Sequence, residues 1–104
     1  MKVLLFVGTS RDDLSRFPLD ARRTAGFELW QVQSGLDPSD WKPVPSVGLG
    51  VREIRIRAKG AWRVIYVTKF GAGVYVLHAF AKKTQKTRKE DIELATRRYR
   101  EIVK

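Results

Sequence analysis

The side chains best suited to chemistry in this 104-residue chain are cations in its second half. Arg55 and Arg57 lie in a segment of alternating polar and apolar residues, and Arg63 lies in the apolar segment that follows. A basic run over 82–88, KKTQKTR, comes after the next apolar segment. A guanidinium fork binds two phosphate oxygens at once, and a basic run entering a helix N-terminus adds N–H groups that favour phosphate. The spacing therefore predicts one concave basic surface for a polyanion, to which the run contributes Lys82, Lys83, Lys86 and Arg88.

The net charge of +10 supports this prediction because it is one-sided. Residues 1–51 carry six basic and six acidic side chains, whereas residues 52–104 carry fifteen basic and five acidic ones. Such an excess favours polyanions as partners. The composition, 43% hydrophobic with 11% aromatics, excludes intrinsic disorder despite the charge.

Arg63 stands out because its strand is otherwise apolar. Alternation puts it on one face with Ile65 and Val67, and puts Tyr66 on the other face. A charge in the apolar middle of a central strand is unfavourable unless it is paired. Two interpretations stay open, a cross-strand pair with Glu53 or a site for an anion.

Other chemistries are excluded by the residue counts. With no cysteine and one histidine, the chain lacks the ligands for a thiolate or histidine-rich metal site, and we predict no metal and no cofactor. Ser10 and Ser46 have no histidine companion in sequence, and His78, in mid-strand, is interpreted as a satisfied core residue. The apolar start, MKVLLFVG, is too short for a signal peptide or membrane span, so we expect a soluble, cytoplasmic protein without a membrane partner.

Cleavage of RNA by its own 2′-hydroxyl remains compatible with these residues. That reaction needs a geometric clamp, cations for the charge developing on the phosphorane, and a proton acceptor and donor such as a Lys or Tyr of lowered pKa. Aromatic side chains would add base stacking. Trp62, Tyr66 and Phe80 are in reach of the same sheet, although core packing is the alternative for each.

The first half of the chain is expected to form a strand and a helical hairpin. Residues 3–7, VLLFV, fit a strand covered on both faces. Ser10 and Asp13 have capping-box spacing for a helix to about residue 17. Pro18 opens a second helix that Gly35 ends, with a buried stripe of Ala21, Ala25, Leu29 and Val32 that Phe27 and Trp30 widen.

The second half is expected to form a meander and a final helix. Residues 35–50 carry no period and predict a long loop that Trp41 tethers. Strands over 51–57, 61–70 and 74–80 follow, joined by tight turns. Thr87 and Glu90 repeat the capping-box spacing before a helix with the apolar stripe Ile92, Ala95, Tyr99 and Ile102. The prediction is one α+β domain over residues 1–104, in the order β-α-α-β-β-β-α, with an antiparallel-dominated four-stranded sheet.

The later segments resemble a known family. Residues 41–43 (WKP), 50–55 (GVREIR), 61–67 (AWRVIYV) and 74–87 (VYVLHAFAKKTQKT) closely resemble the phage-related branch of the RelE/HigB toxins of bacterial type II toxin–antitoxin pairs. The resemblance implies a RelE-like fold and a ribosome-dependent mRNA endonuclease (mRNA interferase) that needs no metal, cuts mRNA in the ribosomal A site and inhibits translation. It also implies a cognate helix-turn-helix antitoxin, HigA-like, that binds the toxin.

The resemblance also implies roles for individual residues. Arg63 matches the family's sheet arginine that contacts the scissile phosphate, Arg55 and Arg57 match its basic second strand, and Lys82 and Lys83 match the cations after its last strand. Well-known members carry a Tyr or His in the first turn of the final helix, where this chain has Glu90, Asp91 and Ile92. Tyr66 or Lys83 is the candidate for the missing proton-transfer group.

Two other hypotheses stay open at this point. The first is a non-catalytic RNA- or ribosome-binding protein on the same scaffold, which the missing Tyr or His favours. The second is a basic face that serves only to bind an acidic segment of the antitoxin.

Overall fold

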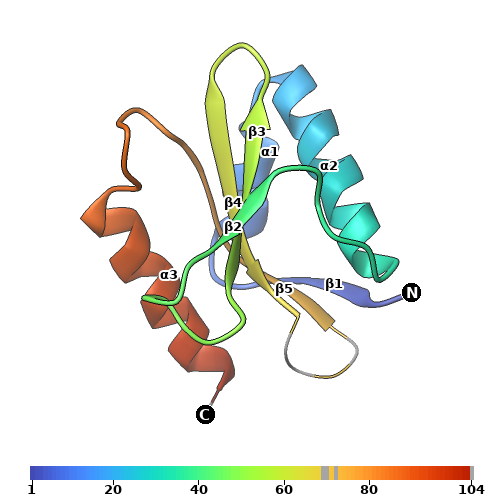
Figure 1. The fold of residues 1–104 in the computed structure, drawn as a ribbon, viewed down its shortest axis with the longest axis vertical. Coiled ribbons are helices and arrows are strands. Elements are labelled where there is room, and N and C mark those ends of the chain that lie inside the picture. The colour runs from blue at the N-terminus through green and yellow to red at the C-terminus, as the bar shows by residue number, and fades with distance from the viewer. Residues whose placement is uncertain (69–70, 72, 104) are drawn as a thin grey trace.

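The computed structural model describes residues 1–68, 71 and 73–103, which form one mixed sheet and three helices (Figure 1). The strands are β1 (Val3–Phe6), β2 (Trp41–Pro43), β3 (Arg52–Arg57), β4 (Ala61–Val67) and β5 (Gly73–Ala81). The helices are α1 (Ser10–Ser15), α2 (Leu19–Gln33) and α3 (Lys89–Ile102). The predicted α+β class is confirmed, and the observed order is β-α-α-β-β-β-β-α.

The sheet has the strand order β1-β5-β4-β3-β2. The predicted meander is confirmed, because β3 pairs antiparallel with β4 and β4 with β5. β1 pairs with β5 in parallel, so the sheet is antiparallel-dominated as expected. Of the predicted strand over 61–70 and the turn after it, residues 69, 70 and 72 lie outside the described residues.

The prediction of four strands is wrong, because the segment predicted as a long loop contains β2. β2 pairs antiparallel with β3 in the register Trp41 to Ile54 and Lys42 to Glu53. β2 has only three residues, too few to show alternation, and one of them is a proline. Proline cannot donate a hydrogen bond to a neighbouring strand, so it is found in strands at the edge of a sheet, where β2 lies. The expected tether is present in a specific form, since the Arg52 guanidinium lies 3.9 Å from the centre of the Trp41 ring.

β1 is an edge strand, and the prediction that both of its faces are covered is wrong. Leu4 and Phe6 pack against the core, whereas Val3 and Leu5 are exposed. A continuous apolar run of four or five residues does not distinguish an edge position from a central one, because that depends on which strands the fold places beside it.

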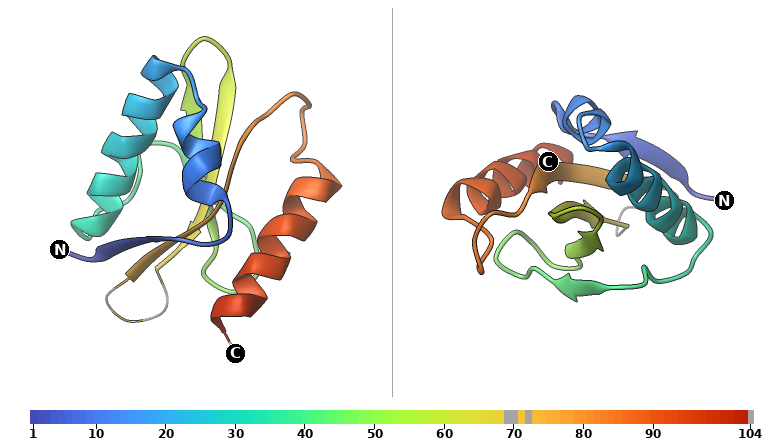
Figure 2. Two further views of the ribbon diagram at one scale, coloured as in Figure 1. Left: turned by 180° about the vertical axis from the view of Figure 1, so that it is seen from behind. Right: turned by 90° about the horizontal axis from the view of Figure 1, so that it is seen from above.

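The helices α2 and α3 lie on opposite sides of the sheet (Figures 1 and 2). One apolar cluster packs beneath each of them. The predicted stripe of α2 is confirmed, since Ala21, Ala25, Leu29 and Val32 are buried with Ile54, Val64 and Tyr66. Phe27 and Trp30 do not widen it and are 56% and 49% exposed. Phe27 lies about 200° around the helix from Ala25, on the solvent side. The stripe of α3 is also confirmed, since it packs with Ile65, Val67 and Leu77.

The predicted helices are present close to their expected bounds, but the predicted N-terminal caps are not. α1 and α2 run side by side in opposite directions (Figure 2), and Gly35, at φ 87°, follows the end of α2 as expected. Neither predicted capping box forms. The Ser10 hydroxyl donates to the Val76 carbonyl, 2.9 Å away, and the Thr87 hydroxyl donates to Glu53, because tertiary partners compete with local N–H groups for these side chains.

Among the described residues, no helix has the length and apolar character needed to cross a membrane.

Candidate nucleic-acid interface

Arg63 lies in the middle of β4 on the face that α3 covers, here called the α3 face. It is 7% exposed and pairs in register with Arg55 of β3 on one side and Phe80 of β5 on the other. Its Nε lies 3.5 Å from Oε1 of Glu53. Burial lowers the pKa of Arg63 from its ordinary value, and the Glu53 carboxylate opposes that shift. Of the two interpretations left open above, the Arg63–Glu53 pair is therefore present.

Glu53 is the anionic centre of this face and is fully buried. Its Oε1 also lies 3.8 Å from Nζ of Lys42, and its Oε2 accepts a hydrogen bond of 2.8 Å from the Thr87 hydroxyl. A buried carboxylate needs such partners to offset its lost hydration. Through this single group, β2, β4 and the segment before α3 are linked.

Lys82 joins the same face where β5 ends. Its backbone N–H donates to the Ala61 carbonyl at 2.8 Å, and Ala61 pairs in register with Arg57 of β3. Burial lowers the pKa of Lys82, and the charges of Arg63, Lys42 and Arg55 add to that shift. We call Lys42, Arg55, Arg63 and Lys82 the cation cluster.

The cation cluster carries more positive charge than its carboxylates offset. Glu53 serves two of the cations, and Arg55 approaches Asp40 only at 3.8 Å, with both side chains partly exposed. The Nε of Arg55 is buried and has no hydrogen-bond partner among the described residues. An unpaired guanidinium N–H beside further cations is suited to an anionic oxygen.

The other predicted cations lie around this cluster and are exposed. Arg57 ends β3, and Lys83, Lys86 and Arg88 lie in the segment that runs from β5 to α3. The structure therefore brings Arg55, Arg63 and Lys82 together, and Lys86 lines one cavity with Lys42 and Glu53, whereas Arg57, Lys83 and Arg88 are exposed in the adjoining segments.

Tyr66 is not brought to this face. It is 1% exposed in the cluster beneath α2, on the opposite side of the sheet from Arg63. Burial raises the pKa of Tyr66, and its interaction with Arg52 opposes the shift. A tyrosine buried on that side of the sheet does not reach a phosphate bound by Arg63.

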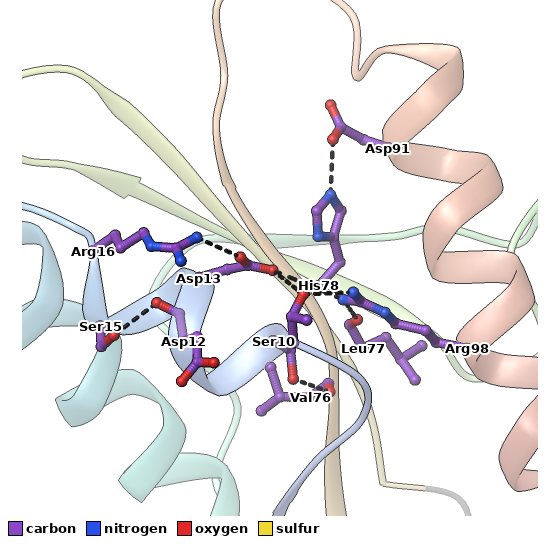
Figure 3. A network of polar contacts seen from close by, with 11 residues as sticks. Ser10, Asp12, Asp13, Ser15, Arg16, Val76, Leu77, His78, Asp91 and Arg98 are labelled. Atoms are coloured by element: carbon purple, nitrogen blue, oxygen red, sulfur yellow. Dashed lines mark hydrogen bonds and ion pairs between the residues drawn. The ribbon is translucent and has the colours of Figure 1, made fainter.

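His78 forms a pair with Asp91 that the sequence analysis did not identify (Figure 3). The His78 Nε2 lies 2.7 Å from Oδ1 of Asp91, in the first turn of α3, and the ring stacks on Phe80 with centroids 4.6 Å apart. Burial lowers the pKa of His78, and the hydrogen bond to Asp91 opposes that shift. His78 is therefore a core residue, as interpreted from the sequence, and its partner is Asp91, noted above as a departure from the family. It is satisfied only in part, since its Nδ1 is buried without a hydrogen-bond partner among the described residues.

A second polar network fixes α3 to α1 and β5 (Figure 3). Arg98 donates to the Leu77 carbonyl and to the Thr9 hydroxyl, both at 2.8 Å, and lies 4.0 Å from Asp13. Leu77 is the extra residue of a bulge in β5, since Ile65 pairs with His78 and Tyr66 with Val76. The bulge leaves the Leu77 carbonyl available to Arg98.

Lys42 and Glu53 are the functional candidates that sequence reasoning undervalued. Lys42 comes from β2, which has no strand signal, so nothing in the sequence placed it opposite Glu53. Among the described residues, no group of three or more His, Cys, Asp or Glu side chains is arranged to hold a metal ion. The face is therefore defined by cations around one carboxylate, an arrangement suited to binding a nucleic-acid backbone.

Comparison of the sequence with models of known protein families identifies the family of this chain. A family model described as Phage derived protein Gp49-like (DUF891) matches residues 12–100. The chain belongs to this family, a phage-derived, toxin-like family related to toxins of the RelE/HigB type. No curated protein matched the chain.

Proposed function

We propose that this protein is the toxin of a type II toxin–antitoxin pair of the RelE/HigB type, acting in the cytoplasm as a ribosome-dependent mRNA endonuclease. The observation that carries the proposal is the cation cluster around Arg63, on a chain whose family is toxin-like. The RNA backbone lies on this face, and the message is cut in the ribosomal A site.

The cations bind and polarise the scissile phosphate. Arg55 and Arg63 stand directly opposite each other on neighbouring strands, and Lys82 lies next to them at the end of β5. Positive groups fixed before the reaction stabilise the charge that develops on the phosphorane without further reorganisation. Glu53 holds Arg63 and Lys42 in place for this role.

Cleavage by the 2′-hydroxyl requires one proton to leave and one to arrive. The 2′-oxygen attacks phosphorus as a base removes its proton, and the bond from phosphorus to the 5′-oxygen breaks as that oxygen takes a proton. The products are a 2′,3′-cyclic phosphate and a 5′-hydroxyl. Lys82, whose pKa is lowered by burial and by its cationic neighbours, is the proposed base that takes the 2′-proton, and exposed Lys83 beside it is the proposed acid that protonates the 5′-oxygen.

Translation of a defined message with purified ribosomes tests this activity. The wild-type protein should cut ribosome-bound mRNA and leave cyclic phosphate ends, and Arg63→Ala should lower the rate at least about 100-fold. The matched control is Arg23→Ala, which removes the same charge from the exposed side of α2. Thermal unfolding of each variant checks that the fold is kept. An intact message with wild-type protein would refute the activity.

A second candidate function is non-catalytic binding to RNA or ribosomes. The supporting observation is that His78, the chain's one histidine, is buried and bonded to Asp91. Its imidazole is therefore not presented to RNA bound at the cation cluster, where it could transfer a proton. Co-sedimentation with ribosomes, without new transcript ends, would identify this function.

The proposed partner is a helix-turn-helix antitoxin of the HigA type. A gene for such a protein beside this one would identify it, and its product should suppress growth arrest when both are expressed. If the partner's acidic segment binds the cation cluster, then RNA and partner must compete, and RNA binding that persists at saturating partner would place the antitoxin elsewhere.

A further inference from the structure

A cavity of about 410 Å³ borders the cation cluster. It lies between the residues that end and follow β2 and the segment before α3, and Lys42 and Glu53 belong to both the cavity and the interface described above. Its volume is within the range of small-molecule sites.

The lining of the cavity combines apolar side chains with a buried carboxylate. Pro43, Val44, Pro45 and Ile92 provide flat or branched apolar surface, and Glu53 lies among them with its charge already paired to Lys42 and Arg63. The apolar part of the lining offers a phosphate no hydrogen bonds. A planar, uncharged ring suits both features, because it buries apolar area and carries polar groups only at its edge.

Polar and positively charged side chains also line the cavity. Ser46 and Gln85 have exposed side chains with hydrogen-bond donors and acceptors, and Lys42 and Lys86 add positive charge. Lys42 is 3.8 Å from the carboxylate that also pairs with Arg63. Cations that hold the RNA backbone are therefore continuous with the cavity.

We propose that this cavity binds one nucleobase of single-stranded RNA, next to the phosphate held by the cation cluster. The proposal rests on the proposed function insofar as RNA must lie on that face. It adds a subsite that contacts a base, with Ser46 and Gln85 as the groups that meet the base edge.

Nucleotide titrations followed by amide resonances test the proposal without any cleavage. Adenosine, guanosine, cytidine and uridine 5′-monophosphates are each compared with ribose 5-phosphate. At least one nucleotide should shift the amide signals of Ser46, Thr87 and Ile92, whereas ribose 5-phosphate should shift only signals of the cation cluster. Equal shifts of the cavity signals by ribose 5-phosphate, or none by any nucleotide, would overturn the base site.

A cavity-filling variant gives a second, independent measurement. Ser46→Trp should weaken binding of a single-stranded RNA hexamer about tenfold, equivalent to about 1.4 kcal/mol. The control is Ser34→Trp, at an exposed position after α2. Equal affinity of the two variants would contradict the proposal. Base binding by a protein that cuts no message would refute the endonuclease and leave the subsite standing, whereas cleavage without base binding would refute the subsite alone.

Discussion

Oε1 of Glu53 lies 3.5 Å from Nε of Arg63, and both side chains are buried on the α3 face of the sheet. The other oxygen of the same carboxylate accepts the Thr87 hydroxyl at 2.8 Å. The orientation of the central cation and the path of the segment before α3 therefore depend on one acidic side chain.

Removal of the Glu53 charge should destabilise the protein. Glu53→Gln leaves the buried Arg63 without its counter-charge, and breaking a buried pair costs about 3 kcal/mol or more. Denaturant unfolding measures this loss. In contrast, Glu93→Gln removes only an exposed pair with Lys89, and should change stability by about 0.5 kcal/mol or less. Similar losses in the two variants would show that the buried pair contributes little.

Arg55 should contribute one phosphate contact to RNA binding. Each such contact accounts for a slope of about −0.7 in a plot of log affinity against log salt for single strands. Arg55→Ala should reduce the magnitude of the slope by about 0.7. Affinities measured for a single-stranded RNA over a range of potassium chloride concentrations test this, with Arg23→Ala as the matched loss of charge. A slope that changes as much in Arg23→Ala would indicate a general charge effect.

The stability of the protein should fall in mild acid because of His78. Burial lowers the pKa of His78 in the fold below its value of about 6.5 in the unfolded chain. Asp91 and Asp13 oppose that shift, and Arg98 adds to it. The unfolded state therefore binds the proton first, and stability is retained above about pH 6.5 and lost as the pH falls through the lowered value.

Unfolding free energies between pH 7.5 and 5 measure this effect. The wild-type loss attributable to His78 should not exceed about 1.4 kcal/mol per pH unit. His78→Gln removes the titrating group and should show a shallower decline over the same range. Parallel curves would assign the acid sensitivity to other groups.

Two glycine substitutions should act in opposite directions. Gly8 has φ 59°, and a Cβ there would lie 2.6 Å from the Arg98 Nε, so Gly8→Ala must displace Arg98 from the Leu77 carbonyl and should cost about 2 kcal/mol. Gly26 has no neighbour within 4 Å of a Cβ, and Gly26→Ala should stabilise α2 by about 1 kcal/mol. Thermal unfolding distinguishes the two, and stabilisation by Gly8→Ala would contradict the packing described.

Alternation along the strands was the most informative pattern in the sequence. It placed Arg63 on one face with Ile65 and Val67, and the packing of those two residues beneath α3 confirms that assignment. The same pattern already put Tyr66 on the face opposite Arg63, so geometry alone argued against Tyr66 as a proton-transfer group.

The features that sequence reasoning missed depend on contacts distant in the chain. β2 has no periodic signal, so Lys42 could not be placed beside Glu53. Thr87 has the spacing of a cap, but a buried carboxylate 34 residues away accepts its hydroxyl. The His78–Asp91 pair forms because α3 packs on β5. The apolar stripe of α3 predicts that the helix packs on the sheet, but not which strand or which residues it contacts.

The extra residue at Leu77 puts two consecutive side chains of β5 on the α3 face. Leu77 packs in the cluster beneath α3, and His78 stands opposite Ile65 of the same cluster. Deletion of Leu77 would therefore leave a regular ladder in which Phe80 still stands opposite Arg63. It would remove a buried side chain and the carbonyl that accepts from Arg98, so we expect such a deletion to spare the cation cluster and to weaken the attachment of α3.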